Sequence, residues 1–248
     1  MSALKRLLSP LPNTLTLLNL VSGCLSIVSA LEGRLLLAGI LVLVAAVFDF
    51  FDGFAARLIG VSSALGKELD SLSDVVSFGV APSVLLYVLM HQNFGREHPE
   101  GFFDGHWLLV VPFFLAAMSS LRLGRFNLDD RQTSSFIGLP TPASALVVVG
   151  VVFGLESTRW GSLFVSLTGC PWLLAALSVG LGLLLVCNLP MFSLKISSLH
   201  PKVAYKQWLL LVGALVALFL FDWAALCFTM AWYIALSVFF GLHEHLGA

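Results

Sequence analysis

The sequence is poor in charged residues. Only 11% of its 248 residues are Asp, Glu, Lys or Arg, whereas 58% are hydrophobic, and the mean hydropathy is +0.97. A soluble domain carries roughly 25% charged residues. This shortage of charge excludes an ordinary soluble domain and predicts a protein that lies in lipid. The formal net charge of −1 shows no basic excess, and we expect no nucleic-acid partner.

Cysteine is also scarce, and linker sequence is absent. The four cysteines stand singly in apolar runs without a Cys-x-x-Cys pair, at Cys24, Cys170, Cys187 and Cys227. We expect them to pack as small apolar side chains, because metal sites and disulfide frameworks usually bring cysteines together at short spacings. No Gly/Ser linker, low-complexity tract or obvious repeat divides the chain, which predicts one membrane domain over residues 1–248.

Long apolar runs are what the sequence has instead. A helix of about 20 residues crosses the hydrocarbon core of a bilayer, which is about 30 Å thick. Runs of this kind predict an all-α polytopic membrane bundle of about eight transmembrane helices, at 13–31, 35–56, 71–91, 106–123, 141–156, 170–188, 206–221 and 223–242. The last two are separated by Phe221-Asp222-Trp223, which predicts a tight hairpin. Pro12, Asn13 and Asn19 interrupt the first run, so we interpret it as a retained helix rather than a signal peptide.

The basic residues predict the orientation of these helices. With a cytoplasmic N-terminus, ten lie in inside segments, namely Lys5, Arg6, Arg57, Lys67, Arg122, Arg125, Arg131, Lys195, Lys202 and Lys206. Three lie outside, namely Arg34, Arg96 and Arg159. Cytoplasmic segments are enriched in Lys and Arg. We therefore expect a multi-pass protein of the cytoplasmic (inner) cell membrane with both termini inside and the polar loop 92–105 outside.

Four aspartates stand within or beside the second and third runs. Asp49 and Asp52 are three residues apart, and Asp70 and Asp74 are four apart, so each pair lies on one face of a helix. Ionised groups at membrane depth are costly and usually functional. The connection between the two runs is short, so we expect the two helices to present all four carboxylates to one another.

A cluster of four carboxylates calls for cations. Like charges at this spacing repel and cannot all stay ionised alone. Oxygen ligands without His or Cys favour Mg²⁺ or Mn²⁺, and two ions would neutralise four carboxylates. The small Gly53 and Ala56 on the same face either let a diphosphate approach the backbone or pack against another helix. From the residues alone, a phosphate-transfer enzyme and an ion or solute transporter both remain possible.

The spacing of these residues resembles a family signature, D-x-x-D-G-x-x-A-R, eight residues, then G-x-x-x-D-x-x-x-D. It matches at every position, namely Asp49, Asp52, Gly53, Ala56, Arg57, Gly66, Asp70 and Asp74. The signature is that of the CDP-alcohol phosphatidyltransferases. The resemblance implies a fold of transmembrane helices, usually dimeric, with a site open to the cytoplasm. It also implies that the hydroxyl of a small alcohol attacks the β-phosphate of a CDP-linked lipid and releases CMP.

The resemblance assigns roles to individual residues. Asp49, Asp52 and Asp70 would ligate metal, and Asp74 would act as the general base with a contact to the second metal. The implied nucleotide and CDP-lipid site consists of Asn13, Thr16, Asp52, Gly53, Ala56, Arg57, Ser63 and Gly66. Asn13 and Thr16 could equally cap the first helix.

A finer resemblance concerns the acceptor. Four segments are similar to the phosphatidylserine synthase branch, namely 48–53, 70–82, 122–127 and 136–142, although that branch often has Ala where Gly124 stands. This similarity implies CDP-diacylglycerol and L-serine as substrates. Arg122, Arg125 and Asn127 could bind the carboxylate of serine, or the arginines could contact lipid phosphates at the membrane boundary. Glycerol 3-phosphate, inositol and inositol phosphate are the alternative acceptors.

Overall fold

The computed structural model describes residues 9–60, 63–94, 107–128, 136–191 and 205–246. These residues are almost entirely helical, which confirms the predicted all-α membrane bundle. The helices are α2 (Leu11–Leu31), α3 (Leu35–Ile59), α4 (Ala64–Asp74), the π-helical turn η1 (Val75–Val80), α5 (Ala81–Phe94), the 3₁₀ turn η3 (Trp107–Val110), α6 (Phe113–Leu128), α7 (Thr141–Leu155), α8 (Gly161–Thr168), α9 (Pro171–Val186), α10 (Tyr205–Phe221), the 3₁₀ turn η4 (Asp222–Ala224) and α11 (Ala225–Leu246). One short antiparallel pair joins β1 (Phe136–Ile137) to β2 (Pro190–Met191).

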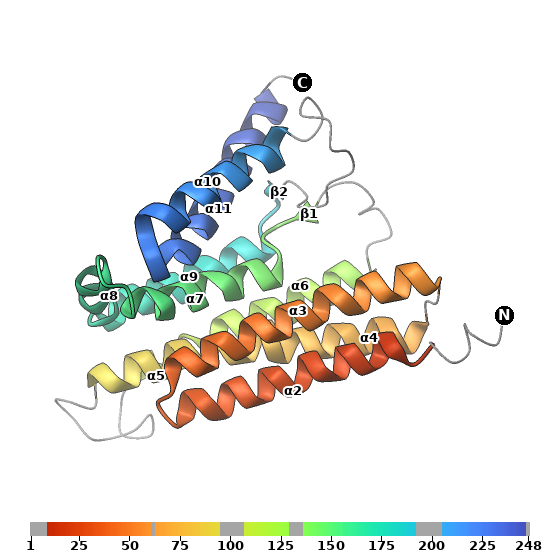
Figure 1. The fold of residues 1–248 in the computed structure, drawn as a ribbon, viewed down its shortest axis with the longest axis horizontal. Helices are drawn as coiled ribbons and strands as arrows, with labels where there is room; N and C mark the ends of the chain where they lie inside the picture. The colour runs from red at the N-terminus through yellow and green to blue at the C-terminus, as the bar shows by residue number, and fades with distance from the viewer. Residues whose placement is uncertain (1–8, 61–62, 95–106, 129–135, 192–204, 247–248) are drawn as a thin grey trace.

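Each of the eight predicted runs contains a helix, but fewer of them meet the length of a membrane span. Among the described residues, five helical segments are long and apolar enough to cross a membrane, or six if α8 and α9, which meet at 87°, form one broken span. Helix α7 has only 15 residues and falls short of that length. The segment Tyr205–Gly241 counts once by length, yet it folds back at η4, and α10 and α11 lie side by side (Figure 1). The predicted hairpin around Asp222 is therefore confirmed.

Helix α2 lies along the outer edge of the N-terminal part of the bundle (Figure 1). It packs chiefly on α3 and also on α4, η1 and α5 (Figure 1). Its inward side carries small and polar residues, whereas its large apolar side chains point outward, as suits a helix in lipid. A Cβ atom on Gly23 would lie 2.8 Å from the Ser77 Cα. This close approach brings α2 against the π turn that follows α4.

Aromatic side chains gather at the turns that were predicted to face outward. Trp107 contacts Trp172 with ring centroids 6.1 Å apart, and Trp160 contacts Phe221 at 5.2 Å. Asp222 adopts a left-handed backbone (φ 52°). Its carboxylate accepts hydrogen bonds from the backbone N and the hydroxyl of Thr158, at 3.3 and 3.2 Å. Trp and Tyr are enriched at membrane–water interfaces, so the two tryptophan contacts favour the prediction that these turns lie at one interface.

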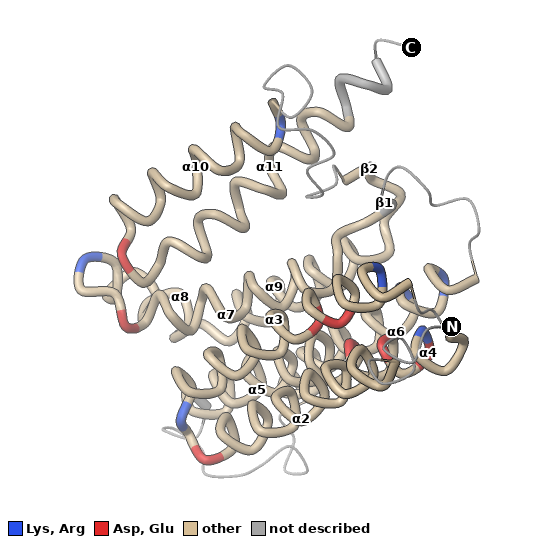
Figure 2. Tube along the Cα trace, turned by 45° about the vertical axis from the view of Figure 1, so that its right-hand side comes forward, with Lys and Arg blue, Asp and Glu red and all other residues tan. Residues whose placement is uncertain are grey.

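The basic residues lie near helix ends. Arg57, Lys67 and Lys206 lie in terminal turns of α3, α4 and α10, and Figure 2 shows the blue segments at two ends of the molecule. The acidic segments, in red, group between α3 and α4 and at the turns. Six residues used in the orientation argument lie outside the described residues, namely Lys5, Arg6, Arg96, Arg131, Lys195 and Lys202.

Candidate active site

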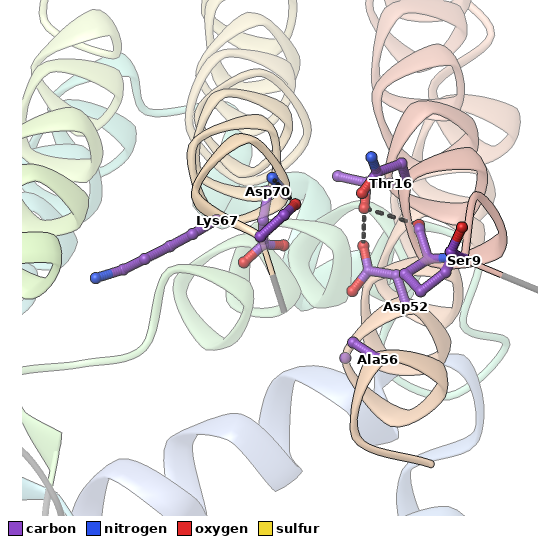
Figure 3. Close-up of a pocket in the computed structure, with 11 residues that line it drawn as sticks. Ser9, Thr16, Asp52, Ala56, Lys67 and Asp70 are labelled. Carbon is purple, nitrogen blue, oxygen red and sulfur yellow. Dashed lines mark hydrogen bonds between the residues drawn. The ribbon is translucent and has the colours of Figure 1, made fainter. Parts of the chain in front are cut away.

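The site forms where α3 and α4 both pack on α2. Helix α3 ends at Gly60, whose left-handed backbone (φ 67°) suits glycine. Helix α4 begins after Ser63, whose hydroxyl oxygen accepts a hydrogen bond from the Gly66 N–H at 3.0 Å. The short connection returns the chain alongside α2, which leaves a pocket among the three helices (Figure 3).

Three of the four aspartates converge. Asp49 from α3 meets Asp70 and Asp74 from α4, and one carboxylate oxygen of each lies within 4.8 Å of the other two. The fourth, Asp52, is outside this trio and is only 5% exposed. Its Oδ2 accepts a hydrogen bond from the Thr16 hydroxyl at 2.6 Å. The spacing argument correctly brought the two helices together, but the four carboxylates do not have equivalent surroundings.

Asp74 is held by a residue that the motif search missed. It is 8% exposed, and the Asn19 side-chain amide donates to its Oδ1 at 3.3 Å. The backbone carbonyl of Asn19 accepts a hydrogen bond from the Ser77 hydroxyl at 3.0 Å. The sequence did hold a sign of this role, because Asn19 is a polar residue in an apolar helix and lies three residues after Thr16, on the same helix face.

The pocket beside Asp52 and Asp70 has a volume of about 340 Å³. It contains seven of the eight residues expected at the nucleotide site, and Arg57 is the exception. Figure 3 shows Thr16, Asp52 and Asp70 around the opening. Four lining residues were not expected at the nucleotide site, namely Ser9, Pro12, Lys67 and Asp70, of which Asp70 was expected as a metal ligand. The full lining is Ser9, Pro12, Asn13, Thr16, Asp52, Gly53, Ala56, Ser63, Gly66, Lys67 and Asp70.

Two glycines of the motif keep this pocket open. A Cβ atom on Gly66 would lie 3.1 Å from the Ser63 Oγ and 3.2 Å from the Asn13 Oδ1, which is crowded. A Cβ atom on Gly53 would meet only the guanidinium of Arg57, at 3.4 Å. Gly53 therefore faces the pocket rather than a neighbouring helix, which favours ligand approach over helix packing as the reason for the small residue.

The acid trio fits a divalent cation. Carboxylate oxygens that share one Mg²⁺ or Mn²⁺ stand a few ångströms apart, and hard oxygen ligands suit these ions. Asp70 Oδ1 is buried without a hydrogen-bond partner among the described residues. Among the described residues no Lys or Arg forms a salt bridge with the trio, although Arg122 interacts electrostatically with Asp74. Two unit charges 4 Å apart interact by about 4 kcal/mol at an effective dielectric of 20, so three converging carboxylates, of which Asp74 is buried and the other two are partly buried, favour a bound cation.

The three residues expected at the acceptor site are placed differently from one another. Arg122 is 9% exposed, its Nη1 lies 3.5 Å from the Thr141 hydroxyl, and it interacts electrostatically with Asp74. Arg125 is exposed. The Asn127 side-chain amide donates to Ser71 Oγ at 2.8 Å, so it ties α6 to α4. Of the three, Arg122 is the one for which an electrostatic interaction with an acid of the trio is found.

Two further positions bear on the sequence expectations. The Asn127 carbonyl accepts a hydrogen bond from Lys67 Nζ at 3.1 Å, and the Lys67 side chain extends away from the pocket in Figure 3. A Cβ atom on Gly124 would meet nothing within 4 Å. The glycine at this position, where the branch often has alanine, therefore changes no packing contact.

Residues 10–184 match the CDP-alcohol phosphatidyltransferase family. The chain therefore belongs to this family, whose members generally use divalent metals. It is 35% identical over 201 residues to a protein of Mycobacterium leprae named CDP-diacylglycerol–serine O-phosphatidyltransferase, a match that covers 78% of this chain and 62% of that protein. A protein of the same name from Helicobacter pylori is 33% identical over 239 residues, which cover 94% of this chain and 86% of the relative.

A third relative has a different name. Archaetidylserine synthase of Methanothermobacter thermautotrophicus is 38% identical over 141 residues, which cover 56% of this chain and 55% of the relative. The matched part spans less than two thirds of the mycobacterial and Methanothermobacter relatives.

Proposed function

We propose that the protein is a CDP-diacylglycerol–serine O-phosphatidyltransferase. It transfers the phosphatidyl group of CDP-diacylglycerol to the hydroxyl of L-serine and releases CMP. The observation that carries this proposal is the carboxylate trio of Asp49, Asp70 and Asp74 beside a pocket bounded by Asp52. The names of the relatives from Mycobacterium leprae and Helicobacter pylori support serine as the acceptor.

The pocket would hold the cytidine diphosphate part of the lipid substrate. Asn13, Thr16 and Ser63 offer polar groups at its edge, and Gly53, Ala56 and Gly66 leave room for the diphosphate beside the backbone. Arg57, one turn after Gly53, would contact a phosphate from the rim. The pocket opens among α2, α3 and α4, so the acyl chains of the substrate can stay in the bilayer.

The carboxylates would hold one or two Mg²⁺ or Mn²⁺ ions through Asp49, Asp52, Asp70 and Asp74. When bound, such ions withdraw charge from phosphorus and stabilise the leaving CMP. Asp52 faces both the pocket and the acids, so it joins the diphosphate site to the trio. Its hydrogen bond from Thr16 fixes the orientation of its carboxylate.

Asp74 would accept the proton of the attacking hydroxyl. The serine oxygen bonds to the β-phosphorus, its proton passes to the Asp74 carboxylate, and the bond from that phosphorus to CMP breaks. A serine hydroxyl is a weak nucleophile until its proton has a positioned acceptor. The amide of Asn19 holds one oxygen of Asp74 and so orients the carboxylate for this transfer. No covalent enzyme intermediate is needed.

Arg122 would select the acceptor by its carboxylate. It lies buried within electrostatic reach of Asp74, which suits an alcohol whose hydroxyl meets the base while its carboxylate meets the guanidinium. Glycerol 3-phosphate, inositol and inositol phosphate are the alternative acceptors for the same chemistry.

We also propose the setting of the reaction. Both termini and the active site would lie on the cytoplasmic side of the inner cell membrane, with residues 1–248 acting as one membrane domain, and the positive-inside pattern supports this orientation. A homodimer is proposed from the family resemblance alone.

The test is CMP release by the purified protein in detergent, with CDP-diacylglycerol and either Mg²⁺ or Mn²⁺. Serine, glycerol 3-phosphate, inositol and inositol phosphate are supplied one at a time. Release with serine alone is the expected result. Release with another alcohol alone would leave the catalytic site in place and refute the acceptor. Absence of release with every acceptor, while metal binds, would favour a transport role, which ion flux in vesicles would reveal.

A further inference from the structure

The last two helices lie beyond residues 10–184, which match the family, yet one of them reaches the acceptor side of the site. Helix α11 packs on α7 and on β2. Helix α10, in contrast, keeps most of its large apolar side chains exposed and packs mainly on α11 (Figure 1). The hairpin therefore has one helix that touches the rest of the protein and one that faces lipid.

The contacts between α7 and α11 show which residues of the two helices lie opposite one another. The Thr158–Asp222 hydrogen bonds tie the end of α7 to the start of α11, so the two helices run in opposite directions. A Cβ atom on Gly150 would lie 2.5 Å from the Cys227 backbone N, which marks their closest approach. Tyr233 lies six residues after Cys227 on α11, and Ser144 lies six residues before Gly150 on α7, which is about 9 Å along each helix. Because the two helices are antiparallel, Tyr233 lies opposite Ser144. Thr141 is about one turn before Ser144.

Arg122 contacts α7 close to this point, at Thr141. Its Nη1 lies 3.5 Å from the Thr141 hydroxyl, and its Nε has no hydrogen-bond partner among the described residues. Its electrostatic neighbours are Asp74 and Tyr233. Tyr233 is 1% exposed and heads the largest fully buried side chains of the described residues. Arg122 therefore interacts electrostatically with an acid of α4 and a phenol of α11, its hydrogen bond goes to Thr141 of α7, and its Nε is left to donate to a ligand.

We propose that Tyr233 is a positioning residue that orients Arg122 toward the carboxylate of the acceptor, which makes α11 a determinant of acceptor specificity. This inference rests on the proposed function. A guanidinium recognises a carboxylate through a planar fork, so its affinity depends on the plane in which it is held. Tyr233 is not among the residues that line the nucleotide pocket. Its effect should therefore concern the acceptor and spare the CDP-lipid.

The substitution Tyr233→Phe tests this role, because it removes one oxygen and keeps the ring. The Michaelis constants for serine and for CDP-diacylglycerol are measured by CMP release. We expect the KM for serine to rise about tenfold, as for a lost interaction with a charged group, while the KM for CDP-diacylglycerol stays within about twofold. Tyr87→Phe on α5 is the matched control, because Tyr87 packs beside His91 and Phe113 away from the acids, and both constants should stay at the wild-type values. Unchanged constants in Tyr233→Phe, or an equal rise in both, would overturn the proposal.

A double variant tests whether Tyr233 acts through Arg122. In an Arg122→Lys background the planar fork is gone, so adding Tyr233→Phe should raise the acceptor KM by less than about twofold further. Effects that multiply fully would show that Tyr233 acts independently, which would refute the positioning role. The wild-type acceptor profile tests the proposed function separately. Should the wild type use another alcohol, the same constants are measured with that alcohol, so the two failures remain distinguishable.

Discussion

At the scale of single residues, the four acids of the motif differ in their hydrogen-bond partners. Asp52 accepts from a hydroxyl, Asp74 accepts from an amide, and Asp70 retains a buried oxygen without a partner among the described residues. A spacing motif treats these residues as equals, but their partners assign them different tasks. Each task predicts a different kinetic defect.

Substituting Asp74 should separate binding from turnover. Asp74→Asn keeps the size of the side chain and removes the proton acceptor, so we expect turnover to fall about 10²–10⁴-fold while CDP-diacylglycerol still binds. CMP release and equilibrium binding of the lipid measure the two effects. Glu156→Gln, at the exposed end of α7, is the control and should behave as wild type. Turnover near the wild-type rate in Asp74→Asn would show that another group is the base.

Thr16 should matter for the nucleotide through Asp52. Thr16→Val removes the hydroxyl that donates to Asp52 at 2.6 Å and preserves the shape of the side chain. We expect the KM for CDP-diacylglycerol to rise about tenfold, as for a lost bond to a charged group, with little change in the KM for serine. Thr14→Val is the matched control, because Thr14 bonds only its own helix at the Pro10 carbonyl. Equal effects of the two substitutions would contradict the role given to Thr16.

Much of the site could be predicted from the sequence, because its residues are close along the chain. Asp49 and Asp52, or Asp70 and Asp74, need only helical geometry to share a face. The partners that come from α2 could not be predicted in the same way. Asn19 lies 55 residues before Asp74 and Thr16 lies 36 before Asp52. Such pairs depend on tertiary packing, which a local pattern does not contain.

At the scale of elements, the Asp222 turn shows how the hairpin of α10 and α11 is fixed. The turn needs a residue that tolerates a positive φ and whose side chain reaches Thr158. Asp and Asn meet the first requirement more readily than other non-glycine residues. The acid is thus a structural residue, unlike the acids of α3 and α4.

Substituting Asp222 should destabilise the protein. Asp222→Ala removes both hydrogen bonds to Thr158 and leaves a left-handed alanine, so we expect a loss of about 1–3 kcal/mol in the free energy of unfolding. Thermal unfolding in detergent would measure this as a lower Tm. Asp222→Asn retains an acceptor oxygen and tolerates the backbone, so its Tm should lie closer to that of the wild type. A Tm for Asp222→Ala equal to that of Asp222→Asn would show that the bonds to Thr158 contribute little.

The elements also show where local patterns fall short. The apolar runs located a helix in every predicted range, and the hairpin at Phe221–Trp223 was found because two apolar runs flank one acid. Helix α8 was missed because its eight residues are too few for a periodic signal. The β1–β2 pair joins residues more than 50 positions apart. The predicted range of α7 was one residue too long at its end. The helix has 15 residues, which are fewer than a membrane span requires, so the prediction of a full span there was not met.

At the scale of the whole molecule, the acid cluster links stability to divalent cations. Buried carboxylates without a cationic partner repel one another, and a cation that binds only the folded state stabilises it by mass action. A ligand at 100 times its Kd contributes about 2.7 kcal/mol. The folded bundle should therefore be more stable with metal than without it.

Metal removal tests this link without any measurement of activity. We expect Mn²⁺ or Mg²⁺ to raise the Tm of the detergent-solubilised protein, and EDTA to reverse the shift. In Asp49→Asn the shift should shrink, and nucleotide binding should weaken with it, because one of the three converging carboxylates is lost. Asp222→Asn keeps the cluster and should show the full shift. A Tm that does not respond to either ion would refute the metal site.

The π turn between α4 and α5 has a consequence for how relatives of this chain are compared. A π-helical turn arises where one extra residue is inserted into an α-helix. In η1 the surplus residue lies between Val75 and Val80, immediately after Asp74. A relative with an uninterrupted helix here would show a one-residue gap in its alignment. Each α-helical residue turns the chain by about 100°, so that gap would rotate all of α5 relative to the acids while the motif itself stayed unchanged.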